Sequence, residues 1–279
     1  MNPTVEIIRS RQNRTVVETA KLSDRKARDA AGCFRFDGIK LFEEAVKKGV
    51  EIRTVLLRES AEQRIREEMT RRCGEDIFAR FSRVLVLSDE VFDKISEEKS
   101  PEGVICVAKY IDKFQKIATI YNSEKKFPFA GERLVLIEAV RDPSNIGAII
   151  RSAAALGVDR LILSADCADI YHPRAVRASM GTLFDQQIDR VKDLSAVICA
   201  LRKEGRRVFA AALRDDAAVL GEFPLVSGDC VVIGNEGHGL SQEVMDACDG
   251  CVIIPMTSRA ESLNAAVAAS IFMWEFAKA

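Results

Sequence analysis

Residues 132–157 read ERLVLIEAVRDPSNIGAIIRSAAALG, and this stretch decides the fold class. The short apolar run Leu134–Glu138 is typical of a buried strand, and the small apolar residues at the end of the stretch follow a helical pattern. A proline and a glycine between them predict a tight turn, and we expect Ser144 or Asn145 to cap the helix. A strand that leads through a tight turn into a helix is the repeating unit of a parallel sheet.

The same alternation continues to the end of the chain and predicts an α/β fold, in which a mostly parallel sheet carries helices on both faces. Ligands of such sheets bind at the carboxyl ends of the strands, so the loops after the strands are where we expect the chemistry. The expected strands are Leu134–Glu138, Arg160–Ser164, Arg207–Ala210, Cys230–Ile233 and Cys251–Pro255, and the expected helices lie near Ala148–Leu156, Ala175–Gly181, Asp193–Lys203, Gln242–Cys248 and Ala265–Phe276.

A chain of 279 residues suits two domains. We expect a small α/β unit over residues 1–110, a polar, lysine-rich linker over residues 111–131 and a second domain over residues 132–279. In the first unit the expected helices are Val16–Ala30, Lys40–Lys48, Ala61–Arg72 and Asp89–Ile95, and the expected strands are Ile52–Leu57, Val84–Leu87 and Val104–Ala108.

Two further loops follow expected strands. Residues 231–241 read VVIGNEGHGLS, and three glycines within six residues let the backbone approach a ligand closely. Their spacing is not that of a Rossmann dinucleotide site, and no phosphate-loop lysine follows. Residues 252–264 read VIIPMTSRAESLN and lead into an alanine-rich helix, at whose start Ser262 and Asn264 are plausible caps.

Charge and cysteine content restrict the class of protein. The 41 basic and 42 acidic residues nearly cancel, so net charge does not indicate a polyanionic partner. Residues 1–30 hold seven basic and four acidic side chains. Two interpretations of this basic segment remain open: contacts with phosphates, or a helix face that is simply solvated. The start of the chain has no apolar signal-peptide core, no segment is apolar enough to span a membrane, and most of the eight cysteines lie in apolar runs. We therefore expect a cytoplasmic protein without a membrane partner.

Cys248 and Cys251 form a C-x-x-C pair, the spacing of many zinc and redox sites. The chain has no second pair of this kind and only two histidines. The pair also lies at the entry of an apolar run, where buried thiols are common. We expect no metal site.

The three loops together resemble the motifs of one family. DPSNIG at 142–147 followed by Arg151 is similar to motif 1 of the SpoU/TrmH-type RNA 2′-O-ribose methyltransferases of the SPOUT superfamily. IGNEGHGLS at 233–241 is similar to motif 2, and IPM at 254–256 with ESLN at 261–264 is similar to motif 3. The amino-terminal domain resembles the family's ribosomal-protein-like substrate-binding domain. Residues 257–260 depart from the pattern, since many members have a glycine and then a valine there.

This resemblance implies a trefoil-knotted catalytic domain, a homodimer formed through that domain, S-adenosyl-L-methionine as the cofactor and RNA as the substrate. The resemblance assigns the cofactor to the neighbourhood of Gly234, Ile254 and Leu263, held mostly by backbone groups. It assigns the catalytic neighbourhood to Asn145, Arg151, Glu236, Ser262 and Asn264.

The chemistry explains these residue types. A sulfonium methyl donor is already electrophilic, so the reaction requires no metal, but a ribose hydroxyl is barely acidic and has to be aligned and deprotonated. We expect Arg151 to bind the phosphate of the target nucleotide and stabilise the developing alkoxide. The resemblance implies that this arginine is itself the base, but because a guanidinium stays protonated we favour removal of the proton through the phosphate. Asn145 and Ser262 are expected to orient the ribose, Asn264 to fix its loop and Glu236 to position the glycine-rich turn.

Three alternatives remain open at the level of sequence: a non-catalytic RNA-binding protein of the same fold, a base methyltransferase, and a ribose methyltransferase that acts on transfer RNA. The asparagine and arginine of motif 1 favour ribose chemistry. The amino-terminal domain favours ribosomal RNA, in particular that of the large subunit, over transfer RNA.

Overall fold

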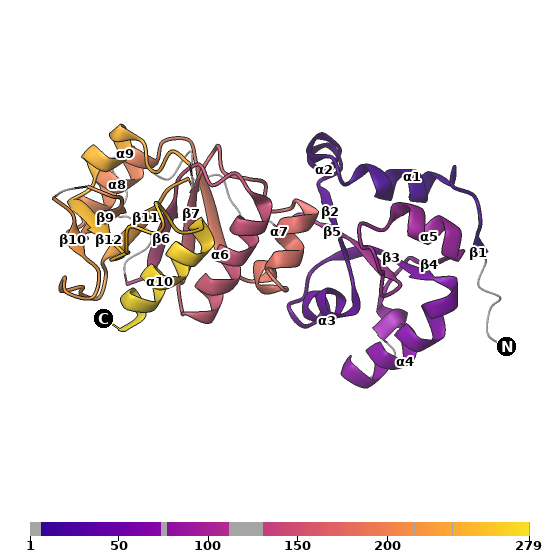
Figure 1. Ribbon diagram of the computed structural model, residues 1–279. Coiled ribbons are helices and arrows are strands. Elements are labelled where there is room, and N and C mark those ends of the chain that lie inside the picture. Colours follow the sequence, from indigo (N-terminus) through magenta and orange to yellow (C-terminus); the bar gives the residue numbers. More distant parts are fainter. Residues whose placement is uncertain (1–6, 74–76, 112–130, 215, 236, 279) are drawn as a thin grey trace. The chain divides into compact units, whose positions relative to one another are not determined.

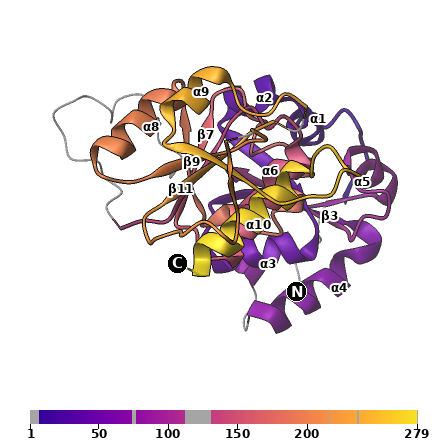
Figure 2. The same ribbon diagram turned by 60° about the vertical axis from the view of Figure 1, so that its left-hand side comes forward.

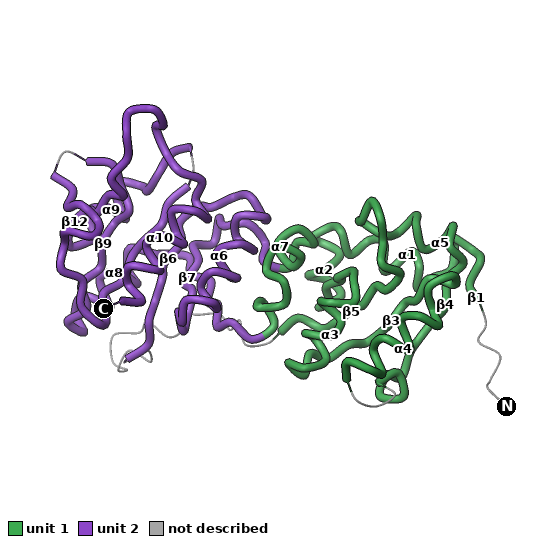
Figure 3. Tube along the Cα trace, turned by 60° about the horizontal axis from the view of Figure 1, so that its bottom comes forward, with its two compact units in different colours: residues 1–111, 171–184 green, residues 112–170, 185–279 purple. Residues whose placement is uncertain are grey.

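The computed structural model (Figure 1) describes residues 7–73, 77–111, 131–214, 216–235 and 237–278. The chain divides into two compact units. Unit 1 comprises residues 1–111 and 171–184, and unit 2 comprises residues 112–170 and 185–279 (Figure 3). The segment 171–184 belongs by its contacts to unit 1, although the sequence prediction placed it within the second domain.

The sheet of unit 1 has five strands in the order β1-β4-β3-β5-β2. Strand β5 is antiparallel to both of its neighbours, whereas β4 is parallel to β3 and to β1. The unit therefore mixes both pairings around its central strand β3. The strands are β1 Ile7–Ile8, β2 Cys33–Asp37, β3 Ile52–Arg58, β4 Val84–Leu87 and β5 Val104–Lys109.

The helices of unit 1 agree with the predicted positions in all but one case. The single helix expected over Val16–Ala30 is wrong: the structure has two helices, because Asp24 accepts a hydrogen bond from the amide of Ala27 and starts a new helix there. The α-helices are α1 Arg14–Lys21, α2 Arg25–Ala31, α3 Ile39–Lys47, α4 Glu62–Cys73, α5 Asp89–Ile95 and α7 Pro173–Ala178, and the 3₁₀ turns are Glu59–Ala61, Ile77–Arg80 and Thr182–Phe184.

Aromatic side chains attach the segment 171–184 to the rest of unit 1. The ring of Phe34 in β2 lies 4.7 Å from that of Tyr171, and Phe36 lies 5.3 Å from Phe184. Tyr171 also stacks on Tyr110, with ring centroids 4.2 Å apart. Buried aromatic pairs of this kind contribute beyond the area they bury, which explains why a segment so far along the chain packs with the first unit.

The basic start of the chain is largely neutralised within unit 1. Ion pairs join Arg9 to Glu59, Arg11 to Glu90, Arg14 to Glu18 and Arg25 to Asp29. Arg28 is buried and donates to two main-chain carbonyl groups. Most of these basic side chains are therefore paired or buried within unit 1, so they do not form a free phosphate-binding patch.

Unit 2 contains a seven-stranded sheet in the order β10-β12-β9-β11-β6-β7-β8, and every recorded pairing in it is parallel. The sequence prediction of an α/β fold with a parallel sheet is confirmed. The strands are β6 Leu134–Ile137, β7 Arg160–Ser164, β8 Gln187–Val191, β9 Val208–Ala211, β10 Ala218–Val219, β11 Cys230–Ile233 and β12 Gly250–Ile253.

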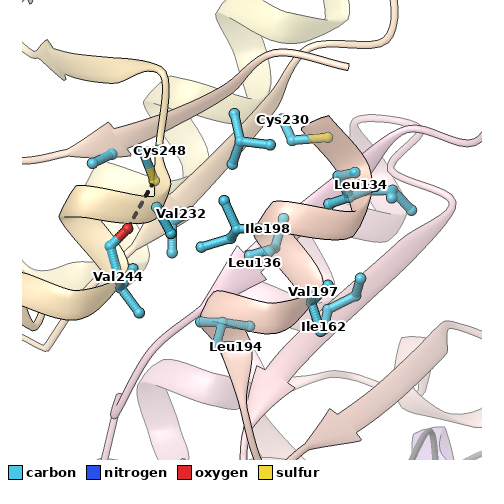
Figure 4. Close-up of a cluster of buried hydrophobic side chains, with 14 of the residues drawn as sticks. Leu134, Leu136, Ile162, Leu194, Val197, Ile198, Cys230, Val232, Val244 and Cys248 are labelled. Carbon is cyan, nitrogen blue, oxygen red and sulfur yellow. Dashed lines mark hydrogen bonds between the residues drawn. The ribbon is translucent and has the colours of Figure 1, made fainter. Parts of the chain in front are cut away.

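Helices cover both faces of this sheet (Figure 2). Alternate residues of a strand point to opposite faces. One face packs under α8 and α9, where Leu136 and Val232 meet Ile198 in a buried cluster (Figure 4). Helices α6 and α10 lie together on the other face. The helices of unit 2 are α6 Pro143–Ala155, α8 Leu194–Lys203, α9 Gln242–Ala247 and α10 Ala265–Lys278.

Strands β2 and β8 were missed at the level of sequence, because each carries charged residues that read as loop. In β2, Arg35 is 1% exposed and its Nη2 lies 2.9 Å from Asp37 Oδ1. In β8, Asp189 is buried with its Oδ2 2.7 Å from Arg160 Nη1 in the neighbouring strand. Burial raises the pKa of Asp189, and Arg160 opposes that rise. The pair in β2 joins two residues of the same strand, whereas the pair in β8 joins two neighbouring strands. In each case the opposite charge accommodates a charged side chain that is buried in the sheet.

None of the helices in the described part of the chain is long and apolar enough to cross a membrane.

Candidate active site

Sheet order brings the first two motif loops to the same edge. Strands β6 and β11 are parallel neighbours, with Ile137 paired with Ile233. The segments 138–147 and 234–241 leave these strands at their carboxyl ends, so they begin side by side. A main-chain hydrogen bond joins the two strand ends, since the amide of Glu138 donates to the carbonyl of Ile233 at 2.9 Å.

The first loop ends in helix α6. Asp142, and not Ser144 or Asn145, is its N-cap: the Asp142 carboxylate accepts from the amide of Ser144 at 2.6 Å, and Pro143 occupies the first helical position. The expectation that Ser144 or Asn145 caps this helix was wrong, because the residue before the proline already has the extended conformation that a cap requires. Asn145 is left for another role.

Arg151 lies on the exposed side of α6. Its guanidinium makes no ion pair or hydrogen bond with any residue that the structure describes. An arginine that is neither buried nor paired remains available to an external anion.

The second loop forms a narrow turn. Asn235 and Gly239 pair through two main-chain hydrogen bonds of 3.0 Å each. A Cβ on Gly234 would lie 2.5 Å from the carbonyl carbon of Gly239 and 2.8 Å from the amide of Leu240. Only glycine allows the two sides of this turn to approach so closely. Glu236, predicted to be catalytic, lies outside the described residues.

The third loop returns to the first. Asn264 caps α10, since its Oδ1 accepts from the amides of Ala266 and Val267 at 3.0 and 3.3 Å. Its Nδ2 donates to Asn145 Oδ1 at 3.0 Å. Two predicted site residues that are 119 positions apart are thereby brought into direct contact.

The remaining predicted residues within the described part of the chain make no side-chain hydrogen bond with one another or with Asn145 and Asn264. Ser262 is exposed, and Ile254 and Leu263 are half-buried. Among the described residues, Arg151 and Ser262 make no hydrogen bond with another predicted site residue. The structure therefore joins motif 1 to motif 3 through Asn145 and Asn264, and it leaves Arg151 and Ser262 open to a ligand.

Helix α10 is held on α6 by small residues. Ser152 Oγ and Ser270 Oγ lie 2.7 Å apart, and the Ser270 hydroxyl also bonds to the carbonyl of Ala266. Ala153 and Ala269 are fully buried in the two helices. This close packing keeps the amino termini of α6 and α10, which carry Asn145 and Asn264, in register.

Residues that the sequence prediction did not select also take part in the site. Glu138 bonds to Ser241, and Asn235 bonds to the carbonyl of Ala139, so that motifs 1 and 2 are tied together. Ala139 has a φ of 53°, a left-handed conformation that is uncommon for alanine. The sequence signal of Glu138, Ala139 and Asn235 is their position within two residues of the end of a buried strand, and Ser241 is the last residue of the stretch that resembles motif 2.

The C-x-x-C pair shows no sign of reactive chemistry. Cys248 is buried, and its thiol donates to the carbonyl of Val244 (Figure 4). Burial raises the pKa of Cys248 to about 12, and burial also raises that of Cys251. Within the described residues, no group of three or more histidine, cysteine, aspartate or glutamate side chains is placed to bind a metal ion.

The three residues predicted to hold the cofactor have no polar side chains. Gly234, Ile254 and Leu263 offer backbone amide and carbonyl groups, and the only side chains among them are aliphatic and half-buried. Main-chain polar groups beside aliphatic side chains are the usual surroundings of a flat, polar-edged ring such as adenine. The residues present therefore fit S-adenosyl-L-methionine.

Comparisons with known proteins agree with this arrangement. The profile of the SpoU rRNA methylase family matches residues 132–274, and that of the MRM3-like substrate-binding domain matches residues 13–106. The chain is 29% identical over 267 residues to the 23S rRNA (guanosine(2553)-2′-O)-methyltransferase RlmP of Bacillus subtilis, covering 96% of this chain and 97% of that protein.

A second relative, the 23S rRNA (uridine(2479)-2′-O)-methyltransferase of Streptomyces viridochromogenes, is 33% identical over 280 residues, with 98% of this chain and 92% of that protein covered. Among solved structures, the AdoMet-bound rRNA methyltransferase of Sinorhizobium meliloti superposes with a TM-score of 0.78 at 27% identity, covering 99% of this chain and 98% of that one. The chain belongs to the SpoU rRNA methylase family.

Proposed function

We propose that this chain is an S-adenosyl-L-methionine-dependent methyltransferase that methylates a ribose 2′-hydroxyl of ribosomal RNA. The observation that carries the proposal is the Asn145–Asn264 contact, which joins motif 1 to motif 3. Helix α6, which begins at this contact, also carries Arg151, which makes no ion pair with the described residues. The names of the relatives, both 23S rRNA 2′-O-methyltransferases, and the match to a substrate-binding domain support ribosomal RNA as the substrate.

The bound cofactor supplies an electrophilic methyl group, so the residues of this chain have to present and deprotonate the hydroxyl. Arg151, exposed on α6, holds the phosphate of the target nucleotide and stabilises the developing alkoxide, and the proton leaves through that phosphate. Asn145 and Ser262 orient the ribose. Asn264 caps α10 and keeps Asn145 in place. Glu236, which lies outside the described residues, is assigned the positioning of the glycine-rich turn.

Gly234, Ile254 and Leu263 are assigned to the cofactor. Two observations support this assignment: the backbone of the glycine-rich turn is in close contact with itself at Gly234, and the other two positions are half-buried aliphatic residues on the third loop. No metal ion takes part in this proposal, because a sulfonium donor does not need a Lewis acid.

We assign residues 1–110 to RNA binding, residues 111–131 to a linker and residues 132–279 to catalysis. Lys21 and Lys26 make no ion pair with the described residues and are exposed. They are therefore the cations of the basic start that remain available to phosphates. Replacing both by glutamate is expected to weaken binding to ribosomal RNA and to leave the affinity for the cofactor unchanged.

A homodimer formed through the catalytic domain is part of the proposal. Val267 and Trp274 lie seven residues apart on α10, on the same face of the helix, and are 48% and 55% exposed. A large exposed tryptophan on an apolar helix face is typical of an interaction surface. Light scattering of the purified chain tests this, and a Trp274→Glu variant is expected to be monomeric.

We further propose that the carboxyl-terminal segment is threaded into a trefoil knot and that the protein works in the reducing cytoplasm. The knot is supported by the return of the chain from β12, past β9 and β11, to α6. The compartment is supported by the eight cysteines, all of which lie in the described part and are free thiols. An experimental chain trace without a crossing there would contradict the knot.

The function is tested by incubating the purified chain with ribosomal RNA and S-adenosyl-L-methionine that carries a labelled methyl group. Labelled, nuclease-resistant 2′-O-methyl dinucleotides are the expected product. Label on a base would point to a base methyltransferase, and calorimetry that shows no cofactor binding would favour a non-catalytic RNA-binding protein. Transfer RNA is the comparison substrate, and mapping of ribose methylation in a deletion strain identifies the nucleotide.

A further inference from the structure

Glu138 makes a two-point contact between the first and second motif loops. It follows β6 directly and is half-buried. Its Oε2 accepts from the amide of Ser241 at 2.8 Å, and its Oε1 accepts from the Ser241 hydroxyl at 2.6 Å. Hydrogen bonds to a carboxylate are short and about twice as strong as those between neutral groups. The contact bridges 103 positions of the chain.

Ser241 is also the N-cap of α9, where its hydroxyl accepts from the amide of Val244. A carboxylate at the amino terminus of a helix is stabilised by the helix dipole. Glu138 therefore holds the point where the glycine-rich turn ends and α9 begins.

A second contact holds the start of the same turn. Asn235 Nδ2 donates to the carbonyl of Ala139 at 2.9 Å, while Asn235 Oδ1 accepts from the amides of Gly237 and His238 at 2.8 and 3.2 Å. Residues 138 and 139 thus contact the glycine-rich turn at both of its ends. These contacts hold the two ends of the turn.

We propose that Glu138 is a positioning residue for cofactor binding, which acts through Ser241 to hold the glycine-rich turn in its binding conformation. This rests on the proposed function, in which Gly234 of that turn contacts S-adenosyl-L-methionine. A turn that is already shaped loses less conformational entropy when the cofactor binds. Loss of the contact is therefore expected to weaken cofactor binding and to leave the rate of the chemical step unchanged.

The test compares Glu138→Ala with Glu138→Gln. Alanine removes both hydrogen bonds. Glutamine retains both without the charge, since its Oε1 can accept from the Ser241 amide and its Nε2 can donate to the Ser241 hydroxyl. Glu138→Ala is expected to raise the Kd and the KM for S-adenosyl-L-methionine by about ten- to a hundredfold. The KM for RNA and the kcat at saturating cofactor stay near those of the unchanged chain, and Glu138→Gln restores most of the affinity.

Cofactor affinity that is unchanged in Glu138→Ala overturns the proposal. An equal loss in Glu138→Ala and Glu138→Gln also overturns it, because glutamine retains both contacts with Ser241 and the loss would then have a cause other than these contacts. If Glu138→Ala does not fold, Ser241→Ala and Ser241→Thr decide. Alanine removes one of the two hydrogen bonds and is expected to weaken cofactor binding, whereas threonine keeps the hydroxyl. Equal affinities in this pair overturn the proposal.

Gly234→Ala separates this inference from the proposed function. If Gly234→Ala abolishes cofactor binding and Glu138→Ala does not affect it, the glycine-rich turn still holds the cofactor and only the role of Glu138 is wrong. If folded Gly234→Ala binds the cofactor normally, the assignment of the turn itself is wrong.

Discussion

The side-chain amide of Asn264 donates to the side-chain carbonyl of Asn145 at 3.0 Å. The other end of the Asn264 amide is occupied by the first turn of α10, so its orientation is determined by the helix. The contact therefore couples the start of α10 to the start of α6. It places the loop before α10, which includes Ser262, next to the residue that we assign to ribose orientation.

Replacing Asn264 by serine or alanine separates its two roles. Serine still caps α10 but is too short to reach Asn145, whereas alanine does neither. We expect Asn264→Ala to lower the free energy of unfolding by about 1 kcal/mol relative to Asn264→Ser, the usual contribution of a cap. Both variants are expected to lose methyl transfer. Denaturant unfolding and kcat measure the two effects, and a fully active Asn264→Ser chain would show that the contact with Asn145 is dispensable.

Arg151→Ala is expected to abolish turnover without unfolding the protein. The side chain is exposed and unpaired among the described residues, so the free energy of unfolding changes by about 0.5 kcal/mol or less. Cofactor affinity, measured by calorimetry, stays unchanged. Arg151→Lys is the control, since it keeps the charge but not the forked donor geometry, and it retains part of the activity. Near-normal turnover of Arg151→Ala on RNA contradicts the assignment.

Gly234→Ala and Gly237→Ala form a matched pair within one turn. At Gly234 the new Cβ would meet backbone atoms at 2.5 to 2.8 Å, which cannot move away without reshaping the turn. At Gly237 the nearest atom is Asn235 Oδ1 at 3.5 Å, an ordinary contact. We expect Gly234→Ala to lose cofactor binding and Gly237→Ala to keep it. Titration calorimetry makes the comparison, and equal behaviour of the two variants would disprove it.

Ala139→Gly is expected to stabilise the protein. Ala139 has a φ of 53°, where an L-residue with a Cβ is strained and glycine is not. The relief exceeds the extra entropy that glycine loses on folding, so the free energy of unfolding rises by about 0.5 kcal/mol. Thermal and denaturant unfolding test this, and a lower stability would mean that the alanine methyl group makes a packing contribution that outweighs the strain.

Buried thiols predict a loss of stability in alkali. Burial raises the pKa of Cys230 to about 11 and that of Cys248 to about 12, from an ordinary value near 9. The unfolded chain therefore loses these protons first as the pH rises, so their contribution to stability is complete below pH 9 and is lost between about pH 9 and 12. A Cys248→Ala variant, despite its cavity, should show a weaker decline with pH over that range.

Thiol labelling of the native protein tests independently which cysteines are accessible. Cys199 is the exposed cysteine and should react first with iodoacetamide, while Cys230 and Cys248 should react only on unfolding. Rapid labelling of Cys248 in the folded chain would show that the C-x-x-C pair is reactive after all.

The sequence by itself determined the alternation of strands and helices in unit 2. Those elements can be predicted from local patterns, namely apolar runs and helical periodicity. The strand Cys230–Ile233, for example, has the bounds that were predicted. The motif residues were also found from sequence, because a resemblance depends on residue types and spacing alone. The α/β class and the family are confirmed.

Tertiary structure decided what no local pattern contains. In strand β8 the charged Asp189 is buried because Arg160 of the neighbouring strand pairs with it, and that partner lies 29 positions away in the sequence. Segment 171–184 packs with unit 1 through aromatic contacts that periodicity does not show.

The site itself depends on the local sequence and on the tertiary structure. The sequence supplied Asn145, Asn264 and the glycine-rich turn, but only the adjacency of β6 and β11 and the packing of α10 on α6 bring them together. Glu138 and Ser241 have no distinctive spacing, so their bond was not predictable. Contacts between positions about a hundred residues apart depend on strand order, and strand order is settled by the packing of the whole sheet.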